Sequence, residues 1–386
     1  MSQFRVVVVL PGSPYPFGDV TGRWSFPLLK GLAKRGFEVR CLSVTTRADW
    51  AAGARACLEP LGVSLRCFAP RSARSWAAGK LATFREPYSY MLSDELRRAV
   101  DEETARGYDV LQLEQLWSGY LAPGRVRTLT SVHYLPSIDL HGEWQPSLRF
   151  FSSKYLMCAT ERRLLKSLVH IRTLTPRLAR AAAGVNPDIQ AHTVPIAIDP
   201  ELFPFSPEDR YDVPVFGFVG NMSWNPGYLS AVRLITRILP RVRMRIPNAR
   251  VLLAGWNARR LLAKYLDAPG VEIVQDVQDV RPYFERLQAL AYPLPKGSGM
   301  MVKVLEAMAY GIPVVTTSEG IEGIDADHSV HALLADDDEA FAEQVVGALQ
   351  DGALRRRLRR HARQLVQDRY SPLATASALE RLYQAL

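Results

Sequence analysis

The chain has 386 residues, and at roughly 100 to 200 residues per domain this length predicts two domains rather than one compact body. Hydrophobic residues make up 48% of the chain and charged residues 23%, which excludes a disordered or fibrous protein. The 48 Lys and Arg exceed the 39 Asp and Glu by 9, a surplus that suits an acidic ligand such as a nucleotide phosphate, a nucleic acid or an anionic membrane.

The four cysteines, Cys41, Cys57, Cys67 and Cys158, have neither the spacing of a metal site nor the density of a disulfide framework. They predict free thiols in a reducing compartment, and we expect a cytoplasmic protein. The first apolar run, Val6 to Leu10, is too short for a signal peptide or a membrane span, and no later segment approaches that length. Any membrane contact is therefore expected to be peripheral, at the inner face.

The first half of the chain alternates between strand and helix patterns. Val6 to Leu10 is an apolar, β-branched run that ends at Pro11 and Gly12, which is typical of a buried strand in a parallel sheet. A helix pattern begins at about Arg23 and ends before Gly36. The alternation continues with predicted strands at 38–44, 63–68, 110–114, 128–133 and 171–174, and with helices at 92–106 and 148–166. This order predicts an α/β fold with a doubly wound parallel sheet.

Prolines at positions 195, 200, 204, 207 and 214 interrupt the alternation. We therefore place a linker at 201–214, after a first domain at 1–200. The second domain, 215–369, repeats the pattern with strands at 215–219, 249–254, 271–274, 289–292 and 313–316 and helices at 228–246, 258–266, 280–287 and 303–310. A last helix at about 370–386 is predicted to pack back on the first domain. Two Rossmann-like domains facing a central cleft favour a two-substrate enzyme.

The segment after the predicted strand at 289–292 has the richest chemistry. Gly297, Ser298 and Gly299 lead into a helix that begins near Lys303, and the free N–H groups of such a helix start bind anions. Lys303 and Glu306 lie three residues apart on one helical face, so the lysine could reach a diphosphate and the carboxylate a pair of sugar hydroxyls. The alternative is an ordinary exposed ion pair on the helix surface.

Several stretches together resemble one known family. The run from Lys303 to Val315, Lys-Val-Leu-Glu-Ala-Met-Ala-Tyr-Gly-Ile-Pro-Val-Val, looks like the characteristic motif of the family 4 glycosyltransferases, which belong to the group 1 glycosyl transferases. Four further stretches resemble the same family in the expected order, at 14–39, 131–133, 194–203 and 218–225. The resemblance implies a GT-B fold and a retaining enzyme that uses a nucleotide-diphosphate sugar as donor, with no other cofactor and no metal.

The resemblance also assigns site residues. It implies that Gly12, Arg23, Gly220, Asn221, Gly297, Ser298, Gly299, Lys303 and Glu306 contact the donor, and that His133, Lys303 and Glu306 form the catalytic set. Two positions depart from the family pattern. Ser298 stands where the family has its first glutamate, and the turn at 221–226 lacks the usual basic pair. Lys303 is our candidate replacement cation, with Arg259 and Arg260 as alternatives that could equally be solvated helix residues.

Other predicted site residues have structural alternatives. His133 ends a predicted strand and could instead be a rim histidine bonded to backbone. Gly12, Gly22 and Arg23 lie in or after the loop that in the family approaches donor and acceptor, although Arg23 could be a surface residue at a helix start. Asp279 most simply caps the following helix.

Two runs of basic residues have no assigned role in the predicted site. Arg162, Arg163 and Lys166 form one, and the stretch 355–363 is denser, with six arginines. These runs could dock on anionic lipid or could be solvated faces, and they lack the aromatic residues expected of a nucleic-acid platform. We therefore expect no nucleic-acid partner.

We predict that the enzyme transfers a sugar to a hydroxyl of a glycan, a lipid-linked acceptor or a small molecule. The chain shows no pair of carboxylates placed for a double displacement, which favours attack by the acceptor on the face that the leaving group occupied. Two alternatives are a nucleotide-sugar epimerase of the same fold and a degenerate scaffold without catalysis.

Overall fold

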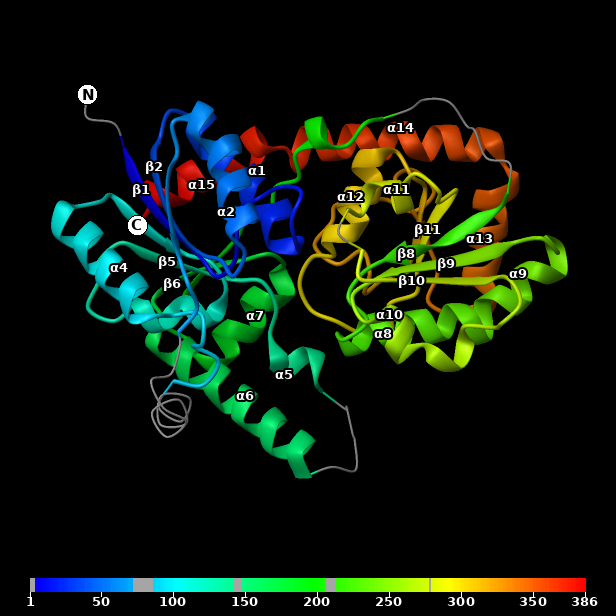
Figure 1. The fold of residues 1–386 in the computed structure, drawn as a ribbon, viewed down its shortest axis with the longest axis horizontal. Helices are drawn as coiled ribbons and strands as arrows, with labels where there is room; N and C mark the ends of the chain where they lie inside the picture. The colour runs from blue at the N-terminus through cyan, green and yellow to red at the C-terminus, as the bar shows by residue number, and fades with distance from the viewer. Residues whose placement is uncertain (1–3, 72–85, 142–147, 206–212, 278) are drawn as a thin grey trace. The chain divides into compact units, whose positions relative to one another are not determined.

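The computed structural model describes residues 4–71, 86–141, 148–205, 213–277 and 279–386. The chain forms two compact units, which we call the N-terminal domain (1–197 with 372–386) and the C-terminal domain (198–371). The last helix, α15 (Pro372–Tyr383), belongs to the N-terminal domain and packs against α1 (Val20–Lys34) (Figure 1). Residues 198–205 belong to the C-terminal domain, where Arg363 donates hydrogen bonds to the carbonyls of Pro200 and Phe203 at 2.8 and 3.0 Å.

The described part of the N-terminal domain contains one parallel sheet in the order β3-β2-β1-β4-β5-β6-β7. The central strand β1 is Val-rich and its side chains from Val6 to Leu10 are buried, as its uniform apolar run predicts. The strands are β1 (Arg5–Leu10), β2 (Glu38–Val44), β3 (Ser64–Phe68), β4 (Val110–Leu113), β5 (Thr128–Val132), β6 (His170–Thr173) and β7 (Gln190–Thr193).

The helices of this domain follow the predicted alternation with differences at their ends. α1 begins at Val20 rather than Arg23 because Asp19 caps it, accepting from the amides of Thr21 and Gly22 at 2.8 and 3.3 Å. Three helices were not predicted, α2 (Ala48–Leu58), α5 (Pro136–Asp139) and α7 (Pro176–Val185). The remaining described helices are α4 (Asp94–Arg106) and α6 (Leu148–Ser167), with 3₁₀ turns at Glu59–Leu61 and Leu116–Leu121.

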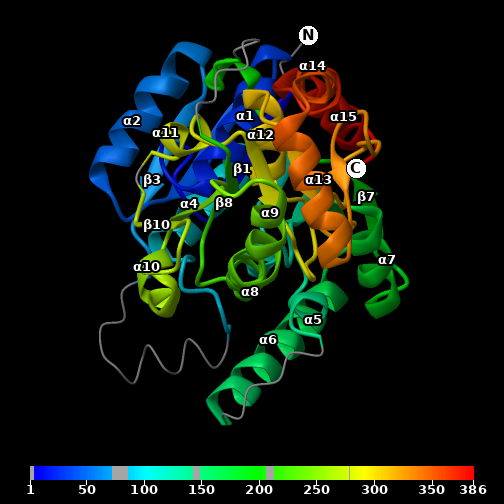
Figure 2. The same ribbon diagram turned by 90° about the vertical axis from the view of Figure 1, so that its right-hand side faces the viewer.

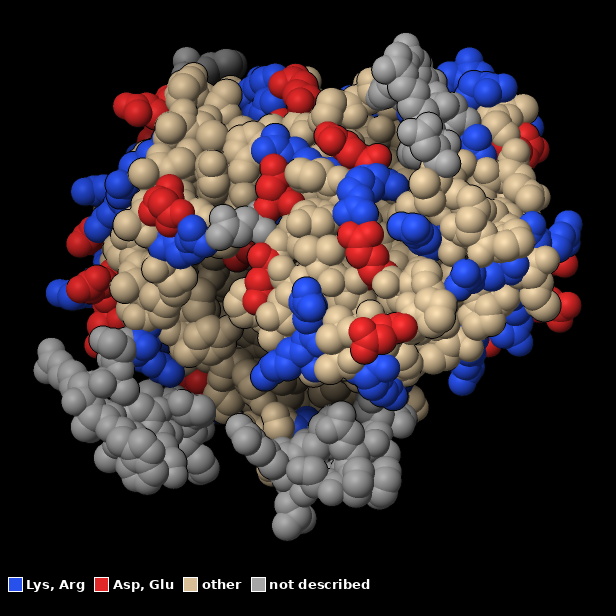
Figure 3. Space-filling view, turned by 45° about the vertical axis from the view of Figure 1, so that its right-hand side comes forward, with Lys and Arg blue, Asp and Glu red and all other residues tan. Residues whose placement is uncertain are grey.

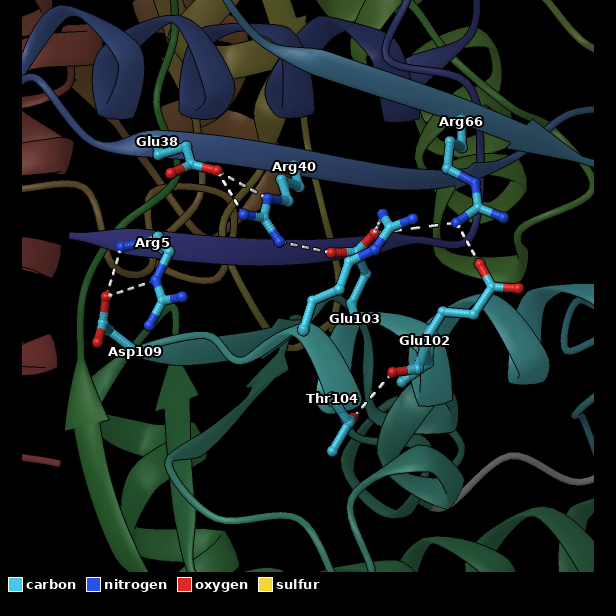
Figure 4. A network of polar contacts seen from close by, with 10 residues as sticks. Arg5, Glu38, Arg40, Arg66, Glu102, Glu103, Thr104 and Asp109 are labelled. Atoms are coloured by element: carbon cyan, nitrogen blue, oxygen red, sulfur yellow. Dashed lines mark hydrogen bonds and ion pairs between the residues drawn. The ribbon is translucent and has the colours of Figure 1, made fainter. Parts of the chain in front are cut away.

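A polar network ties β2 and β3 to α4 (Figure 4). The buried carboxylate of Glu103 accepts from Arg40 at 2.8 Å and from Arg106 at 3.0 Å, and it lies 3.8 Å from Arg66. Arg40 also donates to Glu38, and Arg66 donates to Glu102. The network holds an edge of the sheet to its covering helix far from the predicted ligand side.

The C-terminal domain repeats this design with a second parallel sheet, whose order in the described residues is β10-β9-β8-β11-β12-β13. Its strands are β8 (Val215–Val219), β9 (Arg250–Gly255), β10 (Val271–Gln275), β11 (Ala289–Tyr292), β12 (Val314–Thr316) and β13 (Leu333–Leu334). The prediction of two doubly wound α/β domains is therefore confirmed.

Three predicted helices of this domain differ in the structure. The single helix at 228–246 is α8 (Asn225–Arg233), a π turn (Leu234–Ile238) and α9 (Leu239–Arg245), with the π turn directly before Pro240. The helix at 258–266 shortens to α10 (Ala258–Leu261) and a 3₁₀ turn (Ala263–Tyr265), and that at 280–287 to α11 (Arg281–Phe284). The long helices are α12 (Val302–Tyr310), α13 (Asp338–Gln350) and α14 (Gly352–Arg369), and Pro200–Leu202 forms a 3₁₀ turn.

The arginine run lies on α14, which packs against α12 and α13 (Figure 2). Arg359 donates to the carbonyl of Gly311 at 2.6 Å, Arg363 donates to the carbonyl of Ala309, and Arg355 donates to that of Leu349 at 2.6 Å. Arg356, Arg357 and Arg360 are exposed. Three arginines of the run therefore bind backbone carbonyls inside the domain, and three are exposed to solvent. The run as a whole is thus neither a lipid-binding face nor a fully solvated one. On the face shown in Figure 3, basic and acidic side chains are interspersed.

Among the described residues, no helix combines the length and the apolar character needed to cross a bilayer. All four cysteines are free thiols, as predicted. Burial raises the pKa of Cys41 well above its ordinary value, which makes this thiol a poor nucleophile.

Candidate functional site

The glycine-rich loop of the C-terminal domain leads into α12 as predicted. β11 ends at Tyr292 and α12 begins at Val302, one residue before the predicted start. Gly299 has φ +80°, a left-handed conformation that favours glycine, and Ser298 is only 3% exposed. The residue before the helix, Met301, has an apolar side chain that makes no capping hydrogen bond. The first turn of α12 therefore offers backbone N–H groups and the positive end of the helix dipole to a ligand.

Lys303 is held among aromatic rings at the start of this helix. Its Nζ lies 4.1 Å from the ring centre of Tyr292, 5.1 Å from that of Phe218 and 5.7 Å from that of Trp224. A Cβ atom added to Gly220 would lie 2.9 Å from the same Nζ, so the end of β8 and the Lys303 ammonium are adjacent. Cation–π contacts place the charge without neutralising it. Sequence reasoning missed this cage, because its three rings come from separate strands and turns.

Glu306 lies one turn further along α12 and is fully buried. An exposed Lys303–Glu306 ion pair, the alternative drawn from spacing, is therefore not what the chain forms. Burying a carboxylate costs far more free energy than exposing one, so such a residue is uncommon in a helix interior unless something requires it.

Gly220 and Asn221 form the turn after β8. The Gly220 amide donates to the carbonyl of Ala254 at 2.8 Å, and a Cβ atom added to Gly255 would lie 1.9 Å from the Gly220 carbonyl oxygen. Asn221 is exposed, and its side-chain oxygen accepts from the Ser223 amide at 2.8 Å. Gly220 thus lies beside Lys303, while the Asn221 side chain organises the turn itself.

The other C-terminal candidates lie as follows. Gly297 faces Leu294, Trp224 and Met301, close to the Lys303 cage. Arg259 and Arg260 are exposed on α10. The Asp279 carboxylate accepts from the amide of Arg281 at 3.0 Å, but the residue in the N-cap position of α11 is Val280, so Asp279 is not the cap that the sequence predicts.

In the N-terminal domain, His133 follows β5 and is paired with Glu114, which follows the neighbouring strand β4. His133 Nε2 lies 2.7 Å from Glu114 Oε2. The His133 ring also meets Trp24 edge to face, with 4.5 Å between ring centres. Both residues stand at the carboxyl ends of adjacent parallel strands, where ligand sites of α/β folds lie. Sequence reasoning placed Glu114 in a strand but gave it no role, although its position at such an end was a usable signal.

Glu114 is the centre of a buried network. Its carboxylate accepts from Ser131 at 2.9 Å, from Arg172 at 3.3 Å and from Gln112, and Gln112 in turn accepts from Tyr383 of α15. Burial opposes ionisation of Glu114, but the hydrogen bond from His133 and the charge of Arg172 outweigh it and lower the pKa to about 2. Glu114 is therefore an anion at neutral pH, and its carboxylate is placed to orient the His133 ring.

The loop after β1 packs on the start of α1. A Cβ atom added to Gly22 would lie 1.8 Å from the Tyr15 carbonyl oxygen, so only glycine permits this contact. Gly12 accepts from Ser43 at 3.0 Å through its carbonyl and lies against the Thr21 side chain. Arg23 is half-buried on the first turn of α1. The predicted site residues thus divide between the two domains, with Gly12, Arg23 and His133 in the first and Gly220, Asn221, Gly297 to Gly299, Lys303 and Glu306 in the second.

Comparison with known proteins finds a family match within the C-terminal domain. Residues 213–351 match the model of the family described as glycosyl transferases group 1. Residues of this chain are also 26% identical, over 163 residues, to a Klebsiella pneumoniae protein described as an uncharacterized 44.6 kDa protein in the cps region. That match covers 38% of this chain and 40% of the relative.

Solved structures match the whole chain. Sucrose-phosphate synthase from Thermosynechococcus elongatus has a TM-score of 0.70 and 17% identity, with 99% of each chain covered. Anabaena HepE in complex with UDP and glucose has a TM-score of 0.66 and 15% identity, with 99% of this chain and all of that chain covered. The predicted GT-B fold is confirmed, and the match at 213–351 agrees with the predicted resemblance to the group 1 glycosyl transferases.

Proposed function

Because residues 213–351 belong to the group 1 glycosyl transferases, we propose that this protein transfers a sugar, with retention of anomeric configuration, from a nucleotide-diphosphate sugar to an acceptor hydroxyl. The observation that carries the proposal is the arrangement around α12, where an uncapped helix start, the backbone of Gly220 and the caged Lys303 ammonium come together. Each of these features attracts a diphosphate. The structural similarity to HepE, which was solved in complex with UDP and glucose, supports a nucleotide donor.

In this proposal, Lys303 and the α12 amides stabilise the charge that develops on the departing diphosphate. Glu306, buried one turn behind the helix start, accepts hydrogen bonds from ribose hydroxyls that reach it. Gly297 and Gly299 let the loop backbone approach the donor, and Ser298 offers a neutral hydroxyl to the sugar. His133, oriented by Glu114, contacts the transferred sugar.

The proposal is tested first by binding. We expect UDP, GDP or ADP, or a corresponding nucleotide sugar, to raise the melting temperature of the protein. Lys303→Met removes the charge and keeps most of the stem, and it should weaken nucleotide binding at least ~10-fold, about 1.4 kcal/mol. Lys264→Met is the matched control, because Lys264 is an exposed lysine of the same domain whose Nζ lies 4.8 Å from the Tyr265 ring. Failure of every nucleotide to stabilise the wild-type protein would overturn the proposal.

Separate measurements test the stereochemistry and the two alternative functions, an epimerase and a scaffold without catalysis. NMR of the product from an α-linked donor should show an α-linkage, and a β-linkage would refute retention. Conversion of the donor sugar in the absence of any acceptor would instead indicate the epimerase. A scaffold would tolerate both Lys303→Met and Glu306→Gln, whereas a transferase loses turnover with either.

A further inference from the structure

The N-terminal domain contains a pocket of its own at the carboxyl ends of β1, β2 and β4, with a volume of about 450 Å³. This size is within the roughly 300 to 1,000 Å³ of small-molecule sites. Gly12 and Ser13 of the loop after β1, Thr45 after β2 and Gln115 after β4 contribute to its wall. All of the described lining residues belong to this domain.

Aromatic side chains dominate one wall of this pocket. Trp117 and Tyr88 lie with 5.0 Å between their ring centres and 37° between their planes, and Trp117 Nε1 donates to the Tyr134 hydroxyl at 3.2 Å. Tyr90 also lines the pocket and is 62% exposed. These rings present flat apolar faces together with hydroxyl and indole groups that form hydrogen bonds.

The charge of the pocket is the decisive feature. None of the described lining residues is Lys, Arg or His, and Asp19 is the single charged residue among them. The Asp19 carboxylate caps α1, so the helix start that could have attracted an anion is already paired with one. The guanidinium of Arg47, 4.6 Å from the Trp50 ring centre, is paired with Asp49. Among the lining residues that the structure describes, a phosphate group would meet an acidic side chain and no cation.

Two lining residues have an unusual backbone conformation. Tyr88 has φ +64° and Gln115 has φ +69°, a left-handed region that bulky residues rarely adopt. Such conformations persist only where the surrounding structure fixes them, and they gather at ligand sites. Tyr88 is further held by a hydrogen bond from its hydroxyl to the Ser153 carbonyl at 3.2 Å. The aromatic wall is therefore set in place before any ligand arrives.

We propose that this pocket binds the acceptor and that the acceptor group it recognises is an uncharged saccharide. The apolar C–H face of a sugar ring would stack on Trp117 and Tyr90, while its hydroxyls would bond to neutral groups such as Ser13, Thr45 and Gln115. The inference rests on the proposed transferase function. Of the three predicted acceptor classes, which are a glycan, a lipid-linked acceptor and a small molecule, it selects the glycan. It excludes a phosphorylated sugar and a bare lipid phosphate as the group held in this pocket.

The test uses the whole protein and a panel of fluorescently labelled oligosaccharides of gluco, galacto and manno configuration, each with and without one phosphate. Binding is measured by fluorescence anisotropy, with UDP, GDP and ADP affinities measured in parallel. We expect at least one neutral oligosaccharide to bind more tightly than its phosphorylated counterpart. Tyr90→Ala should raise the Kd of that oligosaccharide ~3- to 10-fold.

Tyr155→Ala is the matched control, because Tyr155 is an exposed tyrosine of the same domain, on α6, and does not line the pocket. It should change the Kd less than twofold. The inference is overturned if the phosphorylated oligosaccharides bind better, if no neutral oligosaccharide binds, or if the two variants behave alike. If no nucleotide binds to the wild-type protein, the proposed transferase function is refuted instead. The saccharide measurements would still decide which group the pocket binds.

Discussion

Replacing Glu114 with Gln should destabilise the N-terminal domain in a way that depends on pH. The change keeps the size of the side chain and removes its charge. Glu114 is fully buried, and its partner Arg172 is only 1% exposed, so the substitution leaves a buried guanidinium without its counter-charge. Arg172 retains its hydrogen bonds to the carbonyls of Val194 and Pro195 at 3.0 and 2.7 Å, which will limit the loss.

The magnitude follows from the pKa of Glu114. Its ordinary value of 4.5 falls to about 2 in the folded protein. At ~1.4 kcal/mol for each pH unit of difference, the ionised carboxylate contributes about 3 kcal/mol to the free energy of unfolding. Because the folded-state pKa is the lower one, this contribution is complete above pH ~5 and is lost as the pH falls from 4.5 towards 2. Glu114→Gln should therefore cost about 3 kcal/mol at pH 7 and little at pH 2.5.

Hydrogen exchange measured by mass spectrometry on peptides that cover β4 and β5 reports this domain separately from the other. Exchange at several urea concentrations, at pH 7, 5, 4 and 3, gives the unfolding free energy of wild type and variant. Glu102→Gln is the control, since Glu102 is an exposed glutamate of α4 paired with Arg66. A loss for Glu114→Gln that is independent of pH, or one no larger than that of the control, would refute the reasoning.

Three further predictions concern stability and the site. Glu103→Gln should lower the melting temperature of the N-terminal domain by calorimetry, since it removes the buried anion that Arg40 and Arg106 share (Figure 4), and an unchanged transition would contradict this. Gly22→Ala, whose new Cβ would overlap a carbonyl oxygen, should displace the loop after β1 and weaken saccharide binding measured by fluorescence anisotropy, and an unchanged Kd would contradict this. Arg359→Met should leave the buried Gly311 carbonyl unpaired and lower the unfolding free energy of the C-terminal domain by about 1 to 3 kcal/mol, measured by urea denaturation. The control Arg357→Met, at an exposed position, should leave this free energy unchanged.

The fold was largely predictable because its strands are buried on both faces. Runs such as Val6–Leu10 are apolar without alternation, and only parallel sheets covered by helices on both sides use such strands. The missed helix α2 begins at Ala48 with no side-chain cap, so its sequence has no clear start signal. The shortened α10 and α11 retain a helical pattern that the loops around them interrupt.

The site was predictable where it is local in sequence. The glycine-rich loop and α12 are one continuous segment, so residue spacing was enough to propose Lys303 and Glu306. The cage around Lys303 and the pairing of His133 with Glu114 depend on which strands are neighbours. That order is β8 beside β11 and β4 beside β5, and strand patterns alone do not specify it. The aromatic pocket likewise gathers residues from six separate segments.

The arginines of α14 give part of the positive surplus a structural reason. The last carbonyls of a helix have no partner within it and carry partial negative charge. Arg359 and Arg363 bind the carbonyls of Gly311 and Ala309 at the C-terminal end of α12, and Arg355 binds that of Leu349 at the end of α13. α12 is the helix whose opposite end is proposed to hold the diphosphate. Anchoring its C-terminal end to α14 fixes the axis along which its N-terminal amides point. Under the proposed function, Arg355, Arg359 and Arg363 therefore support the diphosphate site from the far end of the helix, through packing and capping rather than through contact with the ligand.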